Sequence, residues 1–287
     1  MFAVIAYAAH HLETLYLFTR SDYKTIFFPV LIFCLAVSDE FSLSSFLWTI
    51  IWLWFQLLQA NVSNQTYSGL EDKMNKPWRP LPSGRVTPGQ ARIFRWCLTV
   101  FCLGLSSLRG RVVLFSSAGL TLVEILHDDI GLSGNLILKN LCNVGGYTTF
   151  ELGASACFSS AGTLDRTSVT ALLCSGVIIF TTISAQDFAD VEGDRLSGRR
   201  TFPIVAPEGS RYYILMTILF WSVSLINVWN LGPASGSLFF TLGAYVGFRF
   251  FRFRDKQSDS SNYIWYNIWL VAAHTLPCNT RTHFLIW

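Results

Sequence analysis

Two stretches of this chain carry oxygen-bearing side chains at the spacing of one helix face. The first row combines an amide, a hydroxyl and two carboxylates: Asn64, Ser68, Glu71 and Asp72. The second row has three carboxylates at positions i, i+3 and i+7: Asp187, Asp190 and Asp194. Residues at such spacings share a face when the backbone is helical. Two facing rows would suit Mg²⁺, which takes one or two carboxylates and completes its coordination with water and phosphate. We therefore predict these residues as Mg²⁺ ligands.

Basic residues stand next to both rows. Those that we expect to bind phosphate groups of a substrate are Lys76, Arg79, Lys139 and Arg199. Arg presents a planar fork to phosphate oxygens and Lys a compact charge, and Arg79 is fixed between Pro77 and Pro80. Charges at helix ends are often only solvated, which explains either row alone but leaves the matched spacing of both unexplained. By contrast, we expect the basic run from Arg249 to Lys256 to contact lipid headgroups.

The elements that must position these rows are membrane helices. Of the 287 residues, 52% are hydrophobic and 14% charged, and the mean hydropathy is +0.41. The apolar residues form blocks, and a helix needs about 20 of them to span the hydrocarbon of a bilayer. Nine blocks are candidates, at about 24–38, 43–64, 93–108, 111–126, 136–158, 167–186, 212–229, 234–251 and 262–277. We predict one all-α domain over residues 1–287, a polytopic bundle of about nine transmembrane helices.

The distribution of basic residues predicts the orientation of this bundle. The 21 lysines and arginines lie on the face of the N-terminus and of the loops after even-numbered spans, except Arg109, Arg111, Arg166 and Arg281. Positively charged loops stay in the cytosol. We predict a multi-pass protein of the endoplasmic reticulum membrane with a cytosolic segment 1–23 and cytosolic cap loops 65–92 and 187–211. The seven cysteines lack metal-binding spacing, and we expect membrane lipid but no nucleic acid or obligate protein as a partner.

The motifs, taken together, resemble those of a known family. "NKPWRP" follows the first row, "KN" stands at 139–140, and the second stretch combines D-x-x-D-x-x-x-D with "GRRTFP". This order resembles the UbiA superfamily of intramembrane prenyltransferases, and the resemblance covers most of the chain. It implies a ring of helices around a central cavity and a cytosolic cap where Mg²⁺, together with Lys76, Arg79, Lys139 and Arg199, holds an isoprenyl diphosphate. The lipid tail would lie in the apolar part of that cavity.

The first row departs from the usual family motif, N-D-x-x-D-x-x-x-D. Gln65 and Ser68 replace its first two aspartates, and Glu71 is added before Asp72. The variant resembles the Asn/Ser/Glu metal triad of class I terpene cyclases and the fungal membrane-bound cyclases within the UbiA superfamily. It implies Mg²⁺-dependent ionisation of farnesyl diphosphate and closure to a sesquiterpene in secondary metabolism. The residues we expect to be needed for catalysis are Asp72, Asp187, Lys139, Arg79 and Tyr147.

Two alternatives stay open at this point. A prenyltransferase acting on an aromatic or lipid acceptor shares every diphosphate-binding feature with a cyclase. A transporter or scaffold without catalysis is also compatible with a membrane bundle, although it leaves the two rows without a purpose. Membranes incubated with farnesyl diphosphate and Mg²⁺ but no acceptor would separate all three, because only a cyclase would release a volatile hydrocarbon.

Cyclase chemistry also needs a cavity that protects a cation. Aromatic faces stabilise desolvated cations by up to about 2 kcal/mol, and Tyr147 and Phe150 lie in the block expected to line the cavity. Glu151, an ionisable group within the same block, adjoins them. Lys139 would lie about 18 Å from it on an ideal helix, so either the partner of Glu151 comes from another helix or Glu151 is protonated. Glu124 is expected at the membrane boundary, near His127, Asp128 and Asp129.

Overall fold

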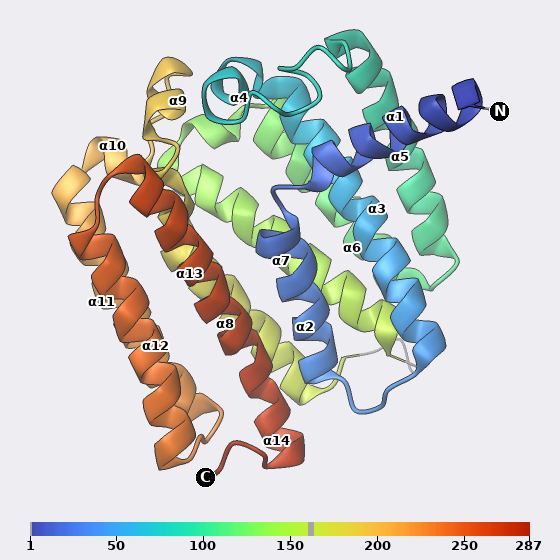
Figure 1. The fold of residues 1–287 in the computed structure, drawn as a ribbon. Coiled ribbons are helices and arrows are strands. Elements are labelled where there is room, and N and C mark those ends of the chain that lie inside the picture. The colour runs from blue at the N-terminus through green and yellow to red at the C-terminus, as the bar shows by residue number, and fades with distance from the viewer. Residues whose placement is uncertain (1, 160–163) are drawn as a thin grey trace.

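The computed structural model describes residues 2–159 and 164–287, and this part of the chain consists of helices joined by turns (Figure 1). Each predicted apolar block coincides with a helical segment: η1–α2 (Tyr23–Phe27 and Phe28–Val37), α3 (Leu43–Tyr67), α5 (Pro88–Ser107), α6 (Arg111–Glu124), α7 (Leu136–Phe158), α8 (Arg166–Thr182), α11 (Pro207–Val228), α12 (Pro233–Arg252) and α13 (Lys256–Thr275). The all-α prediction is confirmed. Three described segments are long and apolar enough to cross a membrane by these criteria alone: α3, α11 and Arg166–Phe188. The number of nine spans remains a prediction.

The long helices close into a ring. Contacts run in the order α2, α3, α5, α6, α7, α8, α11, α12 and α13, and α13 returns to α2. Helices α2 and α3 also pack against α7 across the ring (Figure 1). Gly153 of α7 permits one of these approaches, because a Cβ there would come within 2.2 Å of the Trp52 ring on α3. The central position of α7 brings its side chains to the middle of the bundle.

Short helices gather at one end of this ring. Figure 1 shows α4 (Gly69–Asn75), α9 (Val191–Leu196) and α10 (Phe202–Val205) at the end that also carries α1 (Phe2–Thr19). The short α14 (Asn279–Thr282) and the C-terminus lie at the opposite end. Helices α4 and α9 pack against each other. The two polar rows are therefore brought together at one end of the bundle.

Neither row lies on one continuous helix, which corrects the expectation of two regular helix faces. Helix α3 ends at Tyr67, and Ser68 has φ −91° and ψ 24° before α4 begins. Gly69 follows directly, and Gly is a poor helix former. The second row begins in the 3₁₀ helix η4 (Ile183–Phe188), passes through a turn and ends in α9. The breaks turn the two short helices toward each other.

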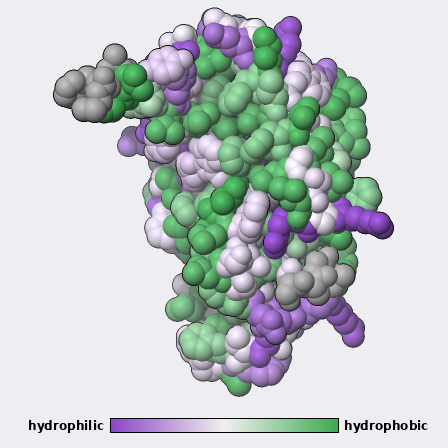
Figure 2. All heavy atoms as spheres, turned by 90° about the vertical axis from the view of Figure 1, so that its right-hand side faces the viewer, coloured by the Kyte–Doolittle hydropathy of each residue, from purple (hydrophilic) through white to green (hydrophobic). Residues whose placement is uncertain are grey.

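The outer surface is suited to lipid. Figure 2 shows hydrophobic side chains over much of one face of the bundle. On α5, Ile93 and Val100 are 69% and 72% exposed. Apolar side chains this accessible are stable next to acyl chains but costly in water.

Candidate active site

The two rows border one cavity, with a volume of about 240 Å³. The predicted site residues that line it are Asn64, Glu71, Lys76, Arg79, Lys139, Tyr147, Asp187, Asp190, Asp194 and Arg199. Apolar and aromatic side chains line another part of its wall: Ile26, Leu57, Leu120, Val123 and Phe150. Two predicted ligands, Ser68 and Asp72, are outside this lining. The cavity thus joins a charged cap to an apolar interior.

Asp72 is occupied by protein partners. Its Oδ1 accepts a hydrogen bond from Arg79 at 2.7 Å, and its Oδ2 accepts one from the Ser68 hydroxyl at 2.8 Å. Arg79 also donates to the Ser21 hydroxyl at 3.0 Å and lies 3.9 Å from Asp22. These contacts fix the guanidinium at the cavity wall. Within the described part of the chain, Asp72 therefore holds Arg79 and does not face the cavity itself.

The other basic residues of the cap pair with carboxylates of the rows. Lys139 donates to Asp187 at 2.6 Å, and both side chains are buried. Lys76 lies 3.8 Å from Asp190. Arg199 contacts Glu71 and lies 3.6 Å from Asp194. The predicted diphosphate-binding residues and the predicted metal ligands thus form one interleaved charge cluster.

Some carboxylate oxygens of this cluster remain without donors. Asp187 Oδ2 and both oxygens of Asp194 are buried and accept no hydrogen bond within the described residues. Burial raises the pKa of Glu71 above its ordinary value, an effect that the nearby Arg199 opposes. A buried, unpaired carboxylate oxygen is costly, and a cation would satisfy it.

The donor set fits Mg²⁺ better than a metal ion whose ligands all come from protein side chains. No three His, Cys, Asp or Glu side chains in residues 2–159 and 164–287 converge closely enough to hold one ion. Mg²⁺ needs only one or two carboxylates and keeps water and substrate phosphate in its coordination shell. The unpartnered oxygens of Asp187 and Asp194 lie beside Lys139 and Arg199, where a diphosphate could complete such a shell.

The aromatic wall is placed as the sequence predicts. Tyr147 and Phe150 both line the cavity. The Tyr147 hydroxyl donates to the Thr25 carbonyl at 2.6 Å, which fixes the ring. Glu151 is fully buried outside the lining and accepts a hydrogen bond from Ser175 of α8 at 2.6 Å, with His274 of α13 at 3.5 Å. Of the two alternatives left open by the sequence, a partner on another helix or a protonated carboxyl, the structure shows the first, because Ser175 and His274 come from α8 and α13.

One part of the cavity wall was not predicted from the sequence. Glu124, His127 and Asp128 line the cavity, although the sequence placed Glu124 at the membrane boundary. They come from the end of α6 and the following π-helical turn η2 (Ile125–Asp129). The signal was the run "EILHDD", whose His–Asp–Asp end reads like an ordinary solvated helix terminus.

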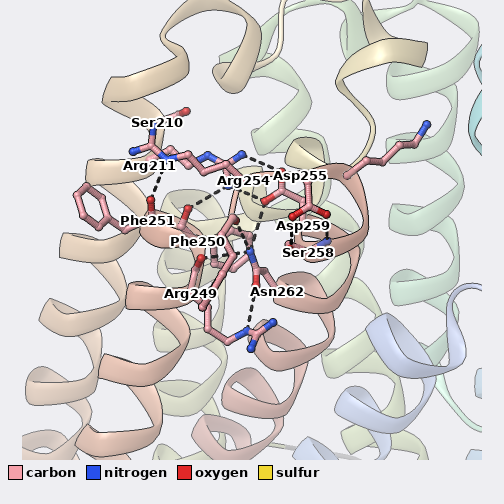
Figure 3. A network of polar contacts seen from close by, with 12 residues as sticks. Ser210, Arg211, Arg249, Phe250, Phe251, Arg254, Asp255, Ser258, Asp259 and Asn262 are labelled. Carbon is pink, nitrogen blue, oxygen red and sulfur yellow. Dashed lines mark hydrogen bonds and ion pairs between the residues drawn. The ribbon is translucent and has the colours of Figure 1, made fainter.

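A second polar cluster joins α11, α12 and α13 (Figure 3). Arg211 donates to both oxygens of Asp259, at 2.5 and 2.8 Å, and to the Phe250 carbonyl at 3.0 Å. Its guanidinium lies 4.1 Å from the centroid of the Phe188 ring, next in sequence to Asp187. This cluster lies outside the cavity lining and ties the helices that support η4.

The basic run expected at lipid headgroups is largely bound to protein. Arg249 donates to Asn262 at 3.0 Å, and Arg254 donates to both oxygens of Glu208 at 2.7 and 2.9 Å. Lys256 donates to a carboxylate oxygen of α9 at 2.7 Å. These pairings were not expected from the sequence, because acidic and amide partners from neighbouring elements could not be placed from it. Contact of the exposed part of this run with lipid headgroups stays a prediction.

Comparisons of the sequence with a family model and with curated proteins point to the same family. Residues 25–271 match the UbiA prenyltransferase family. Fumagillin beta-trans-bergamotene synthase of Aspergillus fumigatus is 30% identical over 277 residues, which are 94% of this chain and 93% of that protein. A diterpene cyclase and a polyprenyl transferase of Hericium erinaceus are each 27% identical, over 92% of this chain and 87% and 93% of their own lengths.

Solved structures share the fold. A digeranylgeranylglyceryl phosphate synthase superposes with a TM-score of 0.67 at 21% identity, over 94% of this chain and 99% of its own. A UbiA homolog from Archaeoglobus fulgidus bound to GPP and Mg²⁺ superposes with a TM-score of 0.64 at 10% identity, over 93% and 99%. At these identities the likeness speaks for the fold alone.

Proposed function

The chain belongs to the UbiA prenyltransferase family, and from that premise we propose that it is a Mg²⁺-dependent cyclase that converts farnesyl diphosphate to a sesquiterpene. Family membership makes it an integral membrane enzyme, either a terpene cyclase or a prenyltransferase. The observation that carries the proposal is the cavity, in which buried carboxylates and paired Lys and Arg adjoin an apolar, aromatic wall. The similarity to proteins named as a bergamotene synthase and a diterpene cyclase, over more than nine-tenths of the chain, supports the cyclase.

We assign metal binding to the residues that face the cavity: Asn64, Glu71, Asp187, Asp190 and Asp194. Bound Mg²⁺ would neutralise the charge that develops on diphosphate as it leaves. Ser68 and Asp72, first predicted as ligands, serve by positioning Arg79, since their polar atoms bind one another and that guanidinium. Gln65 donates to the Phe18 carbonyl at 2.9 Å and so ties α3 to α1.

The basic residues act on the leaving group. Lys76, Arg79, Lys139 and Arg199 are held in place by carboxylates, so they need little reorganisation to meet a diphosphate. Preorganised cations aimed at developing negative charge lower the barrier in a water-excluded site. Lys139 of α7 is buried and lines the cavity, so its charge is screened little by bulk water.

The apolar part of the cavity receives the isoprenyl chain. The faces of Tyr147 and Phe150 stabilise the allylic cation, and the apolar side chains of the wall limit the access of water to it. The apolar side chains of Leu57 and Leu120 shape the space in which the chain folds. We further propose that the cap lies on the cytosolic side of the endoplasmic reticulum membrane, following the charge distribution.

The runner-up function is transfer of the isoprenyl group to an acceptor. The similarity to the polyprenyl transferase supports it, and so does the 31% identity of a Methanococcus maripaludis digeranylgeranylglyceryl phosphate synthase over 56% of this chain. Membranes that contain the protein should be incubated with farnesyl diphosphate and Mg²⁺ without acceptor. A volatile hydrocarbon supports the cyclase. Product that appears only with an aromatic or lipid acceptor supports the transferase and overturns the proposal.

A further inference from the structure

The cavity has a second polar wall that the diphosphate-binding residues do not explain. The π-helical turn η2 contributes His127 and Asp128, and Glu124 of α6 precedes them. These residues lie in the same cavity lining as the aromatic residues of α7. The cap residues already pair carboxylates with basic groups, whereas this wall combines an imidazole with carboxylates. Its chemistry is that of proton transfer.

We propose that His127, oriented by Asp128, accepts the proton that the cyclised cation loses when the reaction ends. The inference rests on the proposed cyclase function and adds a residue to the same site. Departure of diphosphate leaves a carbocation, and ring closure moves the positive charge without removing it. To form a hydrocarbon, one C–H bond must break, its electron pair must become a C=C bond, and the proton must pass to a base. Such a step needs no oxidant or reductant.

The contacts of Asp128 set the orientation and the tautomer of the imidazole. Asp128 Oδ1 lies 2.7 Å from His127 Nδ1, and Ser63 donates to Oδ2 at 2.5 Å. Asn64 donates to Oδ1 at 3.4 Å. The Asp128 side chain is only 4% exposed, so these donors hold a buried carboxylate. A carboxylate accepts only, so Nδ1 carries the hydrogen and Nε2 keeps its lone pair for a proton.

The backbone that carries this pair is anchored from outside. Asp129, the next residue, accepts hydrogen bonds from both terminal nitrogens of Arg95, at 3.1 and 2.6 Å. The Tyr67 hydroxyl also contacts Asp129. Arg95 is a buried residue of α5, so its pairing with Asp129 fixes the turn to the bundle. Asp129 therefore anchors the turn, whereas Asp128 orients the imidazole. Single π-helical turns of this kind recur at functional sites.

Other groups in the cavity are less suited to accept this proton. Asp187, Asp190, Asp194 and Glu71 face Lys or Arg. Glu124 accepts a hydrogen bond from Gln59 at 3.1 Å, and its other oxygen has no donor among the described residues. A buried carboxylate that has no cationic partner is costly to keep charged, and this favours the protonated acid, which has no site left for the proton of the cyclised cation. The imidazole instead becomes a cation beside the Asp128 carboxylate, which stabilises it as the proton arrives.

The test separates ionisation from deprotonation. In His127→Asn the amide can still donate to Asp128, but nothing replaces Nε2. Membranes with each variant receive farnesyl diphosphate and Mg²⁺, and both released diphosphate and the hydrocarbon profile are measured. We expect diphosphate release to stay within roughly threefold of the parent, while the main hydrocarbon falls about tenfold or more in favour of other olefins and alcohols. Asp128→Asn should shift the products in the same direction by less. His11→Asn, on the exposed part of α1, is the matched control and should change neither readout.

The outcomes are distinct. An unchanged product profile in His127→Asn overturns the inference, and so does a product shift that occurs in Glu124→Gln but not in His127→Asn. If His127→Asn and Glu124→Gln each lose diphosphate release and hydrocarbon to the same extent, the wall has a structural role, and the inference is also overturned. If the parent protein gives product only with an acceptor, the proposed cyclase function fails instead, and the inference falls with it.

Discussion

The cap of the cavity and the cluster on α11–α13 both bury ion pairs, but they satisfy them differently. In the cluster, Arg211 meets both oxygens of Asp259, so the carboxylate has no oxygen left without a donor (Figure 3). In the cap, Lys139 meets one oxygen of Asp187, and the second oxygen has no donor within the described residues. In a bidentate pair both carboxylate oxygens have a donor, so no further ligand is needed. In a pair with one free oxygen, that oxygen can still bind a further ligand such as a cation.

This difference separates structural from functional charge. A buried pair that is fully hydrogen-bonded holds its helices in one arrangement, and removing one partner leaves an uncompensated charge. A buried carboxylate that keeps a free oxygen has a cost that a cation can offset. We therefore expect substitutions in the cluster to lower stability and substitutions in the cap to lower activity.

The largest effect is expected for Arg211→Ala. It leaves Asp259 buried without its partner, which should destabilise the protein by about 3–5 kcal/mol. The measurement is thermal unfolding of the purified protein in detergent. Replacing both partners in a double variant, Arg211→Met with Asp259→Leu, should recover most of the lost stability, because no charge is then left unpaired. A double variant as unstable as the single one would contradict the account of this pair.

Asp187→Ala should have the next largest effect, and on activity. It removes a carboxylate that both orients Lys139 and keeps a free oxygen, so turnover of farnesyl diphosphate should fall about 100-fold or more. The thermal unfolding temperature should change less than in Arg211→Ala. Glu192→Gln is the matched control, since Glu192 is an exposed acid of the same cap. Full turnover in Asp187→Ala would remove Asp187 from the site.

A smaller effect is expected for the leaving-group residues. Lys139→Ala should lower kcat about 10- to 100-fold, because its charge counts most as diphosphate departs. Lys139→Arg should recover part of the rate. Arg254→Ala should change kcat by less than about twofold, since its pair with Glu208 is exposed and exposed pairs contribute little. Equal losses of kcat in Lys139→Ala and Arg254→Ala would mean that general surface charge, and not a specific contact with diphosphate, is responsible.

Much of this arrangement could be predicted from the sequence, for physical reasons. Membrane helices are visible as apolar blocks, and the acidic rows and Lys139 stand out because charge is costly beside such blocks. The break at Ser68 could not be predicted from spacing, since i, i+4 positions fit a helix equally well. Nor could the role of His127 and Asp128, because a polar helix end has the same sequence whether it faces solvent or a cavity. Only the packing of α6 against α3 and α7 decides that.

The smallest effect is expected for Ser68→Ala, and it tests the comparison at a single hydroxyl. Ser68 donates to Asp72 at 2.8 Å, and Asp72 in turn holds Arg79. Losing one hydrogen bond of this kind costs about 1 kcal/mol, so turnover should fall about fivefold. The Mg²⁺ concentration for half-maximal rate should stay unchanged, since Ser68 lies outside the cavity lining. Ser197→Ala is the matched control, because among the described residues that hydroxyl bonds only to backbone carbonyls of α9. A raised Mg²⁺ requirement in Ser68→Ala alone would make Ser68 a metal ligand and return the first row to the cation site.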